Sequence, residues 1–281
     1  METHVFLMVL GAAVIHAIWN AILKAGTDRA AAVETMFAAQ GVVALCLLPI
    51  FPMPSTESFG YMLASSALGV AYMEFLQRAY RVGEFSHVYP LARGVVPLLV
   101  ATISVLILGE ELGTTAKLAV LLISAGIVGL SLSRGTDGLR DMRPVAWALG
   151  TSCFIASYTV IDGLGARLSG SVHGYIVWQT VIGAVLVTSA TRALRQGPAA
   201  SVPVRARLAA AVAGLLGFGG AWTVVWAMTQ APLPLVAALR ETSVIFAVVI
   251  GIFFFKERVR LARAASISVA LLGTAVLKAV K

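Results

Sequence analysis

Long apolar stretches separated by short polar breaks fill almost the whole chain. A helix that crosses the hydrocarbon core of a bilayer needs about 20 mostly apolar residues. The breaks carry the glycines, prolines and charged residues that are typical of turns. The pattern predicts ten membrane-spanning helices, at 4–24, 32–51, 59–80, 86–108, 114–132, 144–164, 171–191, 205–228, 232–255 and 261–279.

A weak internal repeat relates the two parts of the chain. Arg93 and Arg240 each interrupt an apolar stretch, and each is followed at the same interval by a glutamate, Glu110 or Glu257. A shift of 147 positions (240 − 93 and 257 − 110) therefore superposes both pairs. Few of the residues between them are identical, although both copies are aliphatic. The repeat indicates a duplicated membrane protein.

The polar break near 133–143 divides the chain into two halves of five spans, 1–133 and 134–281. Because five is odd, the halves must enter the membrane in opposite orientations. We therefore expect an all-α integral membrane protein, with ten transmembrane helices arranged as two inverted five-helix repeats around a central cavity.

Basic residues predict how these spans are oriented. Loops after odd-numbered spans hold 13 of them and the opposite side only 4, so the positive-inside rule places the odd loops in the cytoplasm and both termini in the periplasm. The 13 are Arg29, Arg81, Arg134, Arg140, Arg143, Arg192, Arg195, Arg205, Arg207, Lys256, Arg258, Arg260 and Arg263, and the 4 are Lys117, Arg167, Lys278 and Lys281.

The composition is that of a polytopic membrane protein. Hydrophobic residues make up 59% of the 281 and charged residues 12%, with a mean hydropathy of +0.91, whereas soluble domains average about 25% charged residues. The net charge of +8 lies in short pieces without interleaved aromatics, so we expect no nucleic-acid partner. Cys46 and Cys153 have no metal-ligand spacing, and no enzyme signature is present, so neither a metal, a cofactor nor catalysis is expected.

The two intramembrane arginines need partners away from lipid, because a charge at this depth costs at least about 3 kcal/mol. Arg93 lies about 10 Å inside its span at 1.5 Å per residue. It either binds an anionic substrate group or forms an ion pair with Glu74 or Asp162. Arg240 has Glu241 beside it, and since adjacent helical residues do not face each other, we expect the two to have separate partners.

Span one carries His16, Trp19 and Asn20 on one helical face. An imidazole, an indole and an amide together form a plausible ligand-facing patch. The same three side chains could instead make helix–helix hydrogen bonds, with His16 neutral.

Two acidic residues are candidates for proton coupling, since an intramembrane carboxylate is a natural proton relay. Glu74 in span three also has Arg78 at i+4, a spacing suited to a structural ion pair. Asp162 ends span six. Glu110 and Glu257 stand just before the next helix and are more easily explained as helix-capping residues than as catalytic ones.

Span four combines a hinge with a binding face. Pro90, Gly94 and Pro97 loosen its backbone hydrogen bonds, so we expect a kink or hinge there. Tyr89 lies on the same face as Arg93. Further aromatic residues that can contact an apolar ligand group, or anchor at the membrane interface, are Tyr80, Tyr158, Trp222 and Trp226.

The order and spacing of several short motifs resemble the EamA-type transporters of the drug/metabolite transporter superfamily. The motifs are His16-Ala17-Ile18-Trp19-Asn20, Val88-Tyr89-Pro90-Leu91-Ala92-Arg93-Gly94, Leu108-Gly109-Glu110-Glu111, Leu239-Arg240-Glu241-Thr242 and Lys256-Glu257-Arg258.

The resemblance implies an inverted-repeat basket of ten helices that works by alternating access and exports small metabolites. It also implies that spans five and ten are peripheral, and that spans one, three, four, six, eight and nine line the cavity. Val244 stands where Pro97 stands in the first copy, which lowers the expectation of equal hinges in both halves.

We therefore expect a secondary transporter of the bacterial inner membrane that exports amino acids, with aromatic ones among the candidates, or similar small metabolites. The alternatives are a carrier of anionic solutes such as phosphonates, a multidrug exporter, or a non-transporting membrane partner. Its partners would be the substrate and the bilayer, and it would be a monomer or weak homodimer. The candidate substrate-binding residues are His16, Trp19, Asn20, Tyr80, Tyr89, Arg93, Tyr158, Trp222, Trp226 and Arg240.

Overall fold

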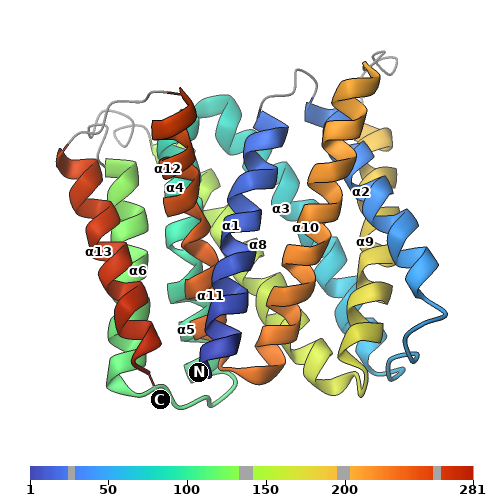
Figure 1. Ribbon diagram of the computed structural model, residues 1–281, viewed down its shortest axis with the longest axis horizontal. Coiled ribbons are helices and arrows are strands. Elements are labelled where there is room, and N and C mark those ends of the chain that lie inside the picture. Colours follow the sequence, from blue (N-terminus) through green and yellow to red (C-terminus); the bar gives the residue numbers. More distant parts are fainter. Residues whose placement is uncertain (25–28, 133–141, 195–202, 256–260, 281) are drawn as a thin grey trace.

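The computed structural model describes residues 1–24, 29–132, 142–194, 203–255 and 261–280, and this part of the chain is helical without strands. Its helices run roughly alongside one another as a single bundle (Figure 1). They are α1 (Thr3–Lys24), α2 (Arg29–Leu47), α3 (Ser58–Val82), α4 (Phe85–Gly94), α5 (Val96–Leu106), α6 (Thr114–Leu132), α8 (Met142–Leu168), α9 (Val172–Leu194), α10 (Val204–Gln230), α11 (Leu233–Glu241), α12 (Ser243–Phe255) and α13 (Leu261–Lys278).

These helices form the ten spans that the hydropathy pattern predicts, because α4 with α5, and α11 with α12, are each one interrupted span. In the described part of the chain, nine spans are long and apolar enough to cross a bilayer. The remaining one, α2, has a shorter apolar stretch, Ala31–Leu47. It ends four residues before the predicted end at 51, since Pro49 disfavours the helical conformation at Leu48.

Both interrupted spans break at equivalent places in the repeat. Val95 separates α4 from α5, and Thr242, 147 positions later, separates α11 from α12. In the first half Pro97 opens α5. In the second half no proline stands at Val244, yet Thr242 donates its hydroxyl to the Leu239 carbonyl at 2.6 Å, which tightens the last turn of α11. Both spans are therefore interrupted at equivalent positions, although only the first break has a proline.

Helices of the first half pair with helices of the second half throughout the bundle. These pairs include α1 with α10, α2 with α9, α3 with α8, α5 with α11, and α6 with α13. Counted as spans, these are one with eight, two with seven, three with six, four with nine, and five with ten. If the two halves are exchanged, so that span one takes the place of span six and so on, the pair of spans one and eight becomes the pair of spans six and three. The other three pairs remain the same. The halves thus interdigitate along their whole length, which is the packing that an inverted repeat produces.

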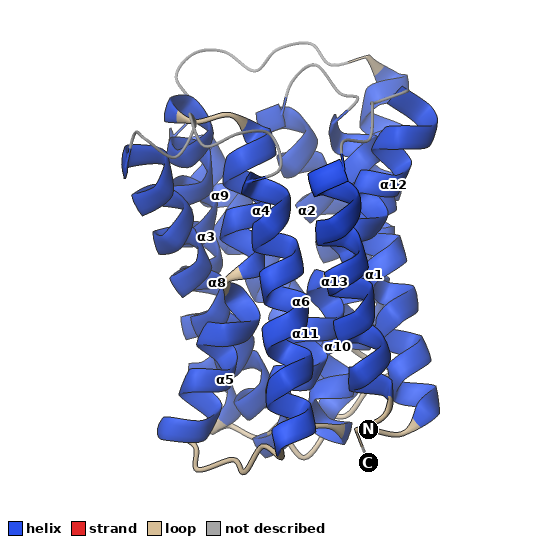
Figure 2. Ribbon diagram, turned by 90° about the vertical axis from the view of Figure 1, so that its left-hand side faces the viewer, coloured by secondary structure: helices blue, strands red, loops and turns tan. Residues whose placement is uncertain are grey.

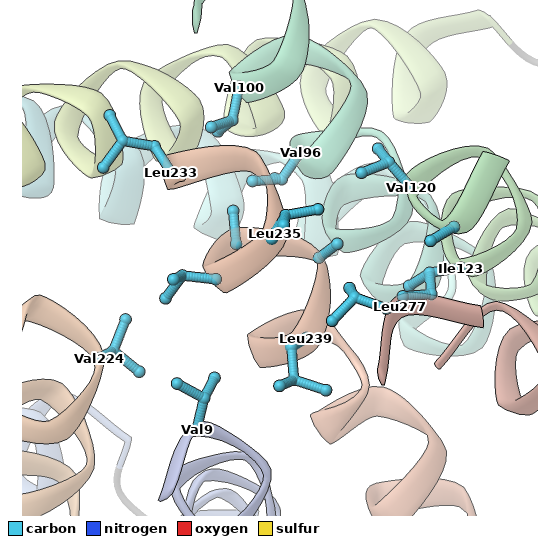
Figure 3. Close-up of a cluster of buried hydrophobic side chains, with 14 of the residues drawn as sticks. Val9, Val96, Val100, Val120, Ile123, Val224, Leu233, Leu235, Leu239 and Leu277 are labelled. Atoms are coloured by element: carbon cyan, nitrogen blue, oxygen red, sulfur yellow. The ribbon is translucent and has the colours of Figure 1, made fainter. Parts of the chain in front are cut away.

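The short helix α11 lies at the centre of the main hydrophobic cluster. All of its residues, 233–241, are buried. Leu233, Leu235 and Leu239 pack among valines of α1, α5, α6 and α10 (Figure 3). Since α11 is enclosed by protein on all sides, the charged residues at its end are held in the middle of the bundle.

Spans five and ten, α6 and α13, lie side by side at one edge of the bundle, where the family resemblance places them (Figures 1 and 2). Glycines allow the close approach of these two helices. A Cβ on Gly126 would lie 2.5 Å from the backbone nitrogen of Ala270, and one on Gly273 would lie 2.7 Å from that of Ile123.

The two chain termini lie at the same end of the bundle (Figure 2). The terminal ammonium of Met1 donates to the Val280 carbonyl at 3.1 Å. An even number of spans requires this arrangement.

We predict that Gly126→Ala destabilises the protein by about 1–3 kcal/mol, because the added methyl group meets backbone atoms that cannot move aside. Gly11→Ala is the matched control, since a Cβ at Gly11 in α1 meets nothing within 4 Å, and alanine favours helix. Thermal denaturation in detergent should show a lower Tm for the first variant and an unchanged or higher Tm for the second. Equal Tm values would contradict the close packing of α6 on α13.

Candidate functional site

A buried ion cluster joins the two interrupted spans. Nε of Arg93, near the end of α4, lies 2.7 Å from Oε2 of Glu241, the last residue of α11. Arg240 donates from Nη2 at 2.8 Å and from Nε at 3.1 Å to the other carboxylate oxygen, Oε1. Glu241 is 0% exposed and Arg93 5%. One carboxylate from the second half therefore neutralises an arginine from each half.

This cluster corrects two expectations from the sequence. Arg93 pairs with neither Glu74 nor Asp162 but with Glu241. Arg240 and Glu241 do contact each other although they are adjacent, because the regular helix ends at Glu241 and the long arginine side chain folds back onto its neighbour's carboxylate.

The contact between Arg93 and Glu241 is an ion pair without hydrogen-bond geometry. Within the described part of the chain, Arg93 Nε and Glu241 Oε2 have no hydrogen-bond partner. Buried polar atoms normally find such a partner. The two side chains are therefore held together by charge attraction rather than by a hydrogen bond.

Span one contributes the next contacts of Arg93. Its Nη2 lies 3.1 Å from His16 Nε2. Since arginine has donors only, Nε2 of His16 accepts, so the imidazole is neutral with its proton on Nδ1. The His16 ring meets Trp19 edge-on with centroids 4.7 Å apart, and Asn20 donates its amide to the His16 carbonyl at 2.7 Å.

Aromatic and hydroxyl side chains from α3, α4 and α8 surround the remainder of the cluster. Arg240 Nη2 donates to Thr159 Oγ1 at 3.2 Å. Tyr158 meets Tyr72 edge-on at 6.0 Å, and the Arg93 guanidinium lies 6.0 Å from the Tyr89 ring centroid. These three tyrosines are only half-buried. The charged centre is thus bordered by aromatic side chains that keep accessible surface.

The cluster carries one excess positive charge. In the described residues, Glu241 is the one carboxylate that contacts either arginine. Two arginines and one glutamate sum to +1, with His16 neutral. An isolated charge at this depth is costly, so the centre is suited to one further negative charge.

A second polar cluster lies around Asp162 in α8. Gln179 Nε2 donates to Asp162 Oδ1 at 3.0 Å, and the Tyr175 hydroxyl donates to the same oxygen at 3.3 Å. Gln179 also contacts Ser65 Oγ at 3.0 Å, so this cluster links α3, α8 and α9.

Glu74 forms the ion pair that its spacing allows, with Arg78 Nε 2.8 Å from its Oε1. Arg78 is about half exposed and also lies 5.2 Å from the Trp147 ring centroid. The geometry gives Glu74 a structural partner.

Three candidate binding residues lie away from the central ion cluster. Trp222 belongs to an aromatic group with Phe51 and His173, and it donates its indole N–H to His173 Nδ1 at 3.1 Å. Trp226 contacts His4, near the N-terminus, with ring centroids 6.1 Å apart. Tyr80 packs with the small hydrophobic group of Ala79, Val88, Ala92 and Ala148. The other seven candidates adjoin the cluster. Asn20 does so indirectly, because its amide donates to the His16 carbonyl.

The predicted hinge residues lie around the first break. Pro90 is inside α4, Gly94 ends it, and Pro97 stands in the first turn of α5. Gly94 packs closely on α6, where a Cβ would lie 2.9 Å from the backbone nitrogen of Val128.

Glu110 is structural, although not as a helix cap. Its Oε1 accepts from Arg167 Nη1 at 2.8 Å, and Arg167 also donates to the carbonyls of Met228 and Ala231. This contact ties the end of span four to the ends of α8 and α10, across the two halves. Its repeat partner Glu257 lies outside the described residues.

Three residues of the site were not among the sequence candidates: Tyr72, Thr159 and Glu241. The one available signal for Glu241 was a carboxylate inside an apolar span at the position where the first copy has Gly94. Among the described residues, no three His, Cys, Asp or Glu side chains come together as metal ligands.

Comparisons with known proteins agree on the architecture. The EamA-like transporter family matches residues 4–132 and 142–278, one five-span unit each. No curated protein matches the chain. A solved structure described only as "Crystal structure of protein" superposes with a TM-score of 0.79 over 99% of this chain and 98% of that chain, at 16% identity. At this identity the likeness concerns the fold alone.

We predict that Glu241→Gln destabilises the protein by about 3–5 kcal/mol, because it leaves two buried arginines without a counter-charge. Glu34→Gln is the matched control, since its partner Arg192 is 70% exposed, and surface ion pairs contribute about 0–1 kcal/mol. Denaturation in detergent should separate the two variants clearly. A Glu241→Gln protein as stable as the Glu34→Gln protein would contradict a structural role for the cluster.

Proposed function

Because the chain belongs to the EamA-like transporter family, we propose that it is a secondary transporter of the bacterial inner membrane that exports amino acids or similar small carboxylates. The observation that carries the proposal is the +1 charge of the ion cluster formed by Arg93, Arg240 and Glu241. A carboxylate with a single negative charge neutralises this cluster.

The charge of the cluster favours amino acids over the alternative cargoes. Two arginines by themselves would suit a doubly charged phosphonate, but Glu241 already neutralises one of them. A dianion would leave the buried centre with a net negative charge. Cationic drugs would be repelled by it, because charges interact strongly where water is excluded.

The aromatic border supports a cargo with an apolar side chain. Trp19, Tyr72, Tyr89 and Tyr158 come from four helices and are half-buried around the ion cluster. Indole and phenol rings offer a large apolar surface together with a polar edge. A substrate whose carboxylate reaches Arg93 would bring its side chain against these rings, which includes the aromatic amino acids.

The ion cluster also offers a means of coupling binding to movement. Arg93 and Glu241 belong to different halves, and each lies within two residues of a helix break. A substrate carboxylate competes with Glu241 for Arg93 and so weakens a contact between the halves. A ligand shifts a conformational equilibrium only through such differential contacts.

The first test is counterflow of radiolabelled amino acids into proteoliposomes, with a phosphonate as the competing cargo. We expect saturable amino acid exchange that Arg93→Ala reduces at least about thirtyfold, equivalent to about 2 kcal/mol for a lost buried charge pair. Arg192→Ala, the same substitution at an exposed arginine, should retain exchange.

Exchange confined to the phosphonate would replace the amino acid assignment by the anion carrier. Trp226→Ala tests the binding role of an indole that lies beside His4, and we expect a smaller loss than for Arg93→Ala.

We predict that both termini face the periplasm, because basic residues concentrate after the odd-numbered spans and the positive-inside rule places those loops in the cytoplasm. Alkaline phosphatase fused after Val280 should therefore be active, and green fluorescent protein at the same place should be dark. The reverse pair of results would invert the orientation while leaving the ten spans unchanged.

A further inference from the structure

Asp162 presents a carboxylate inside the membrane with only neutral partners. Gln179 and Tyr175 both donate hydrogen bonds to its Oδ1. In the described residues, no lysine, arginine or histidine contacts this carboxylate. The other carboxylates within spans described above, Glu34, Glu74 and Glu241, are each paired with arginine. An unneutralised carboxylate within a span is costly and needs a functional explanation.

Asp162 lies next to the ion cluster on the same face of α8. Thr159, which accepts from Arg240, is three residues before it, and Tyr158 is four residues before it. Residues at these spacings are neighbours on a helix. Asp162 is therefore about one helical turn, roughly 5 Å along the axis, from the residue that holds Arg240. The site has a positive pole and, one turn away, a negative pole.

Gln179 extends the negative pole. Its Nε2 donates hydrogen bonds to Asp162 and Ser65. Its Oε1 is buried and has no hydrogen-bond partner in the described part of the chain. A donor that approaches Asp162 would find this second acceptor on the neighbouring helix α9.

We propose that Asp162 binds the ammonium group of a zwitterionic substrate and exchanges it for a proton. The inference rests on the proposed function. With Asp162 ionised, Arg93, Arg240, Glu241 and Asp162 sum to zero, which complements a zwitterion whose carboxylate meets the arginines.

The exchange is balanced in charge and in protons. When the substrate binds, the carboxylic acid of Asp162 releases its proton to water, and the carboxylate that remains pairs with the substrate ammonium, which keeps its own protons. When the substrate leaves, the carboxylate takes up one proton again. Since ammonium and proton compete for one carboxylate, transport is antiport.

Several other ionisable groups lie near Asp162. From the elements packed against α8, the ionisable groups that face this region are Tyr61 and Tyr72 of α3, Tyr175 of α9, Tyr89 and Arg93 of α4, and Arg240 and Glu241 of α11, together with Tyr158 of α8 itself. Tyrosines ordinarily ionise near pH 10 and arginines stay protonated. The nearby parts of α5 and α10 carry no ionisable residue.

The decisive experiment drives transport with a pH gradient alone. Proteoliposomes with an acidic lumen are given a radiolabelled mixture of L-amino acids outside, and accumulation is compared with counterflow. We expect wild-type protein to accumulate label above the external concentration, and a protonophore to abolish this. Asp162→Asn should lose the accumulation. Glu74→Gln is the matched control, because it removes a different intramembrane carboxylate, on α3, and should still accumulate label.

A second readout tests the ammonium contact directly. Phenylalanine and its des-amino analogue, 3-phenylpropionate, compete for counterflow. Wild-type protein should prefer phenylalanine at least about tenfold, the size of one charge-assisted contact, and Asp162→Asn should lose the preference.

The outcomes separate the inference from the proposed function. Absence of counterflow by wild-type protein would overturn the proposed function and the inference with it. Counterflow with undiminished pH-driven accumulation in Asp162→Asn, or its loss in Glu74→Gln, would overturn the inference alone. If Asp162→Asn is inactive in every assay, the deciding variant is Asp162→Glu, which keeps a carboxylate at this position. We expect Asp162→Glu to restore pH-driven accumulation. An Asp162→Glu protein that shows counterflow but no pH-driven accumulation would overturn the inference.

Discussion

The charge of Glu241 is the constraint on which the centre of this protein depends. Two arginines lie where neither lipid nor bulk water can solvate them, and Glu241 contacts both. Removing one member of a buried ion group is far more damaging than replacing the whole group by apolar residues. The cluster as a whole therefore contributes little net stability, but the structure requires all three of its members to be present together. The cluster joins the ends of α4 and α11, one from each half.

The buried position of α11 meets the requirement that the charged residues at its end stay away from lipid. A helix that carries Arg240 and Glu241 must keep both away from lipid, and α11 is buried along its whole length. Its leucines fill the space between α1, α5 and α10 (Figure 3). The apolar packing thus places a charged helix end at the middle of the bundle, and the helix break at Thr242 lets two adjacent side chains meet.

Departures from the repeat create the chemistry of the site. The paired arginines are symmetric, but Glu241 has Gly94 as its counterpart, and Asp162 has Ile15. A duplication with glycine at both of these positions would have left the two buried arginines without a carboxylate. The second half supplies both acidic residues, and with them the charge balance that favours a zwitterion. The first half supplies His16 and Trp19, which complete the surroundings of Arg93.

The sequence by itself determined the ten spans, their division into two halves and the presence of two arginines inside the bundle, because span length and the cost of a buried charge depend on local composition. Only the tertiary structure decided which carboxylate neutralises the arginines. Helical periodicity assigned Arg240 and Glu241 to different directions, and that rule fails where the helix ends. It also decided which aromatic residues adjoin the charges: Tyr89 and Tyr158 do, while Trp222 meets His173 instead. Such contacts join segments that are far apart in the chain, and no local pattern encodes the distance between them.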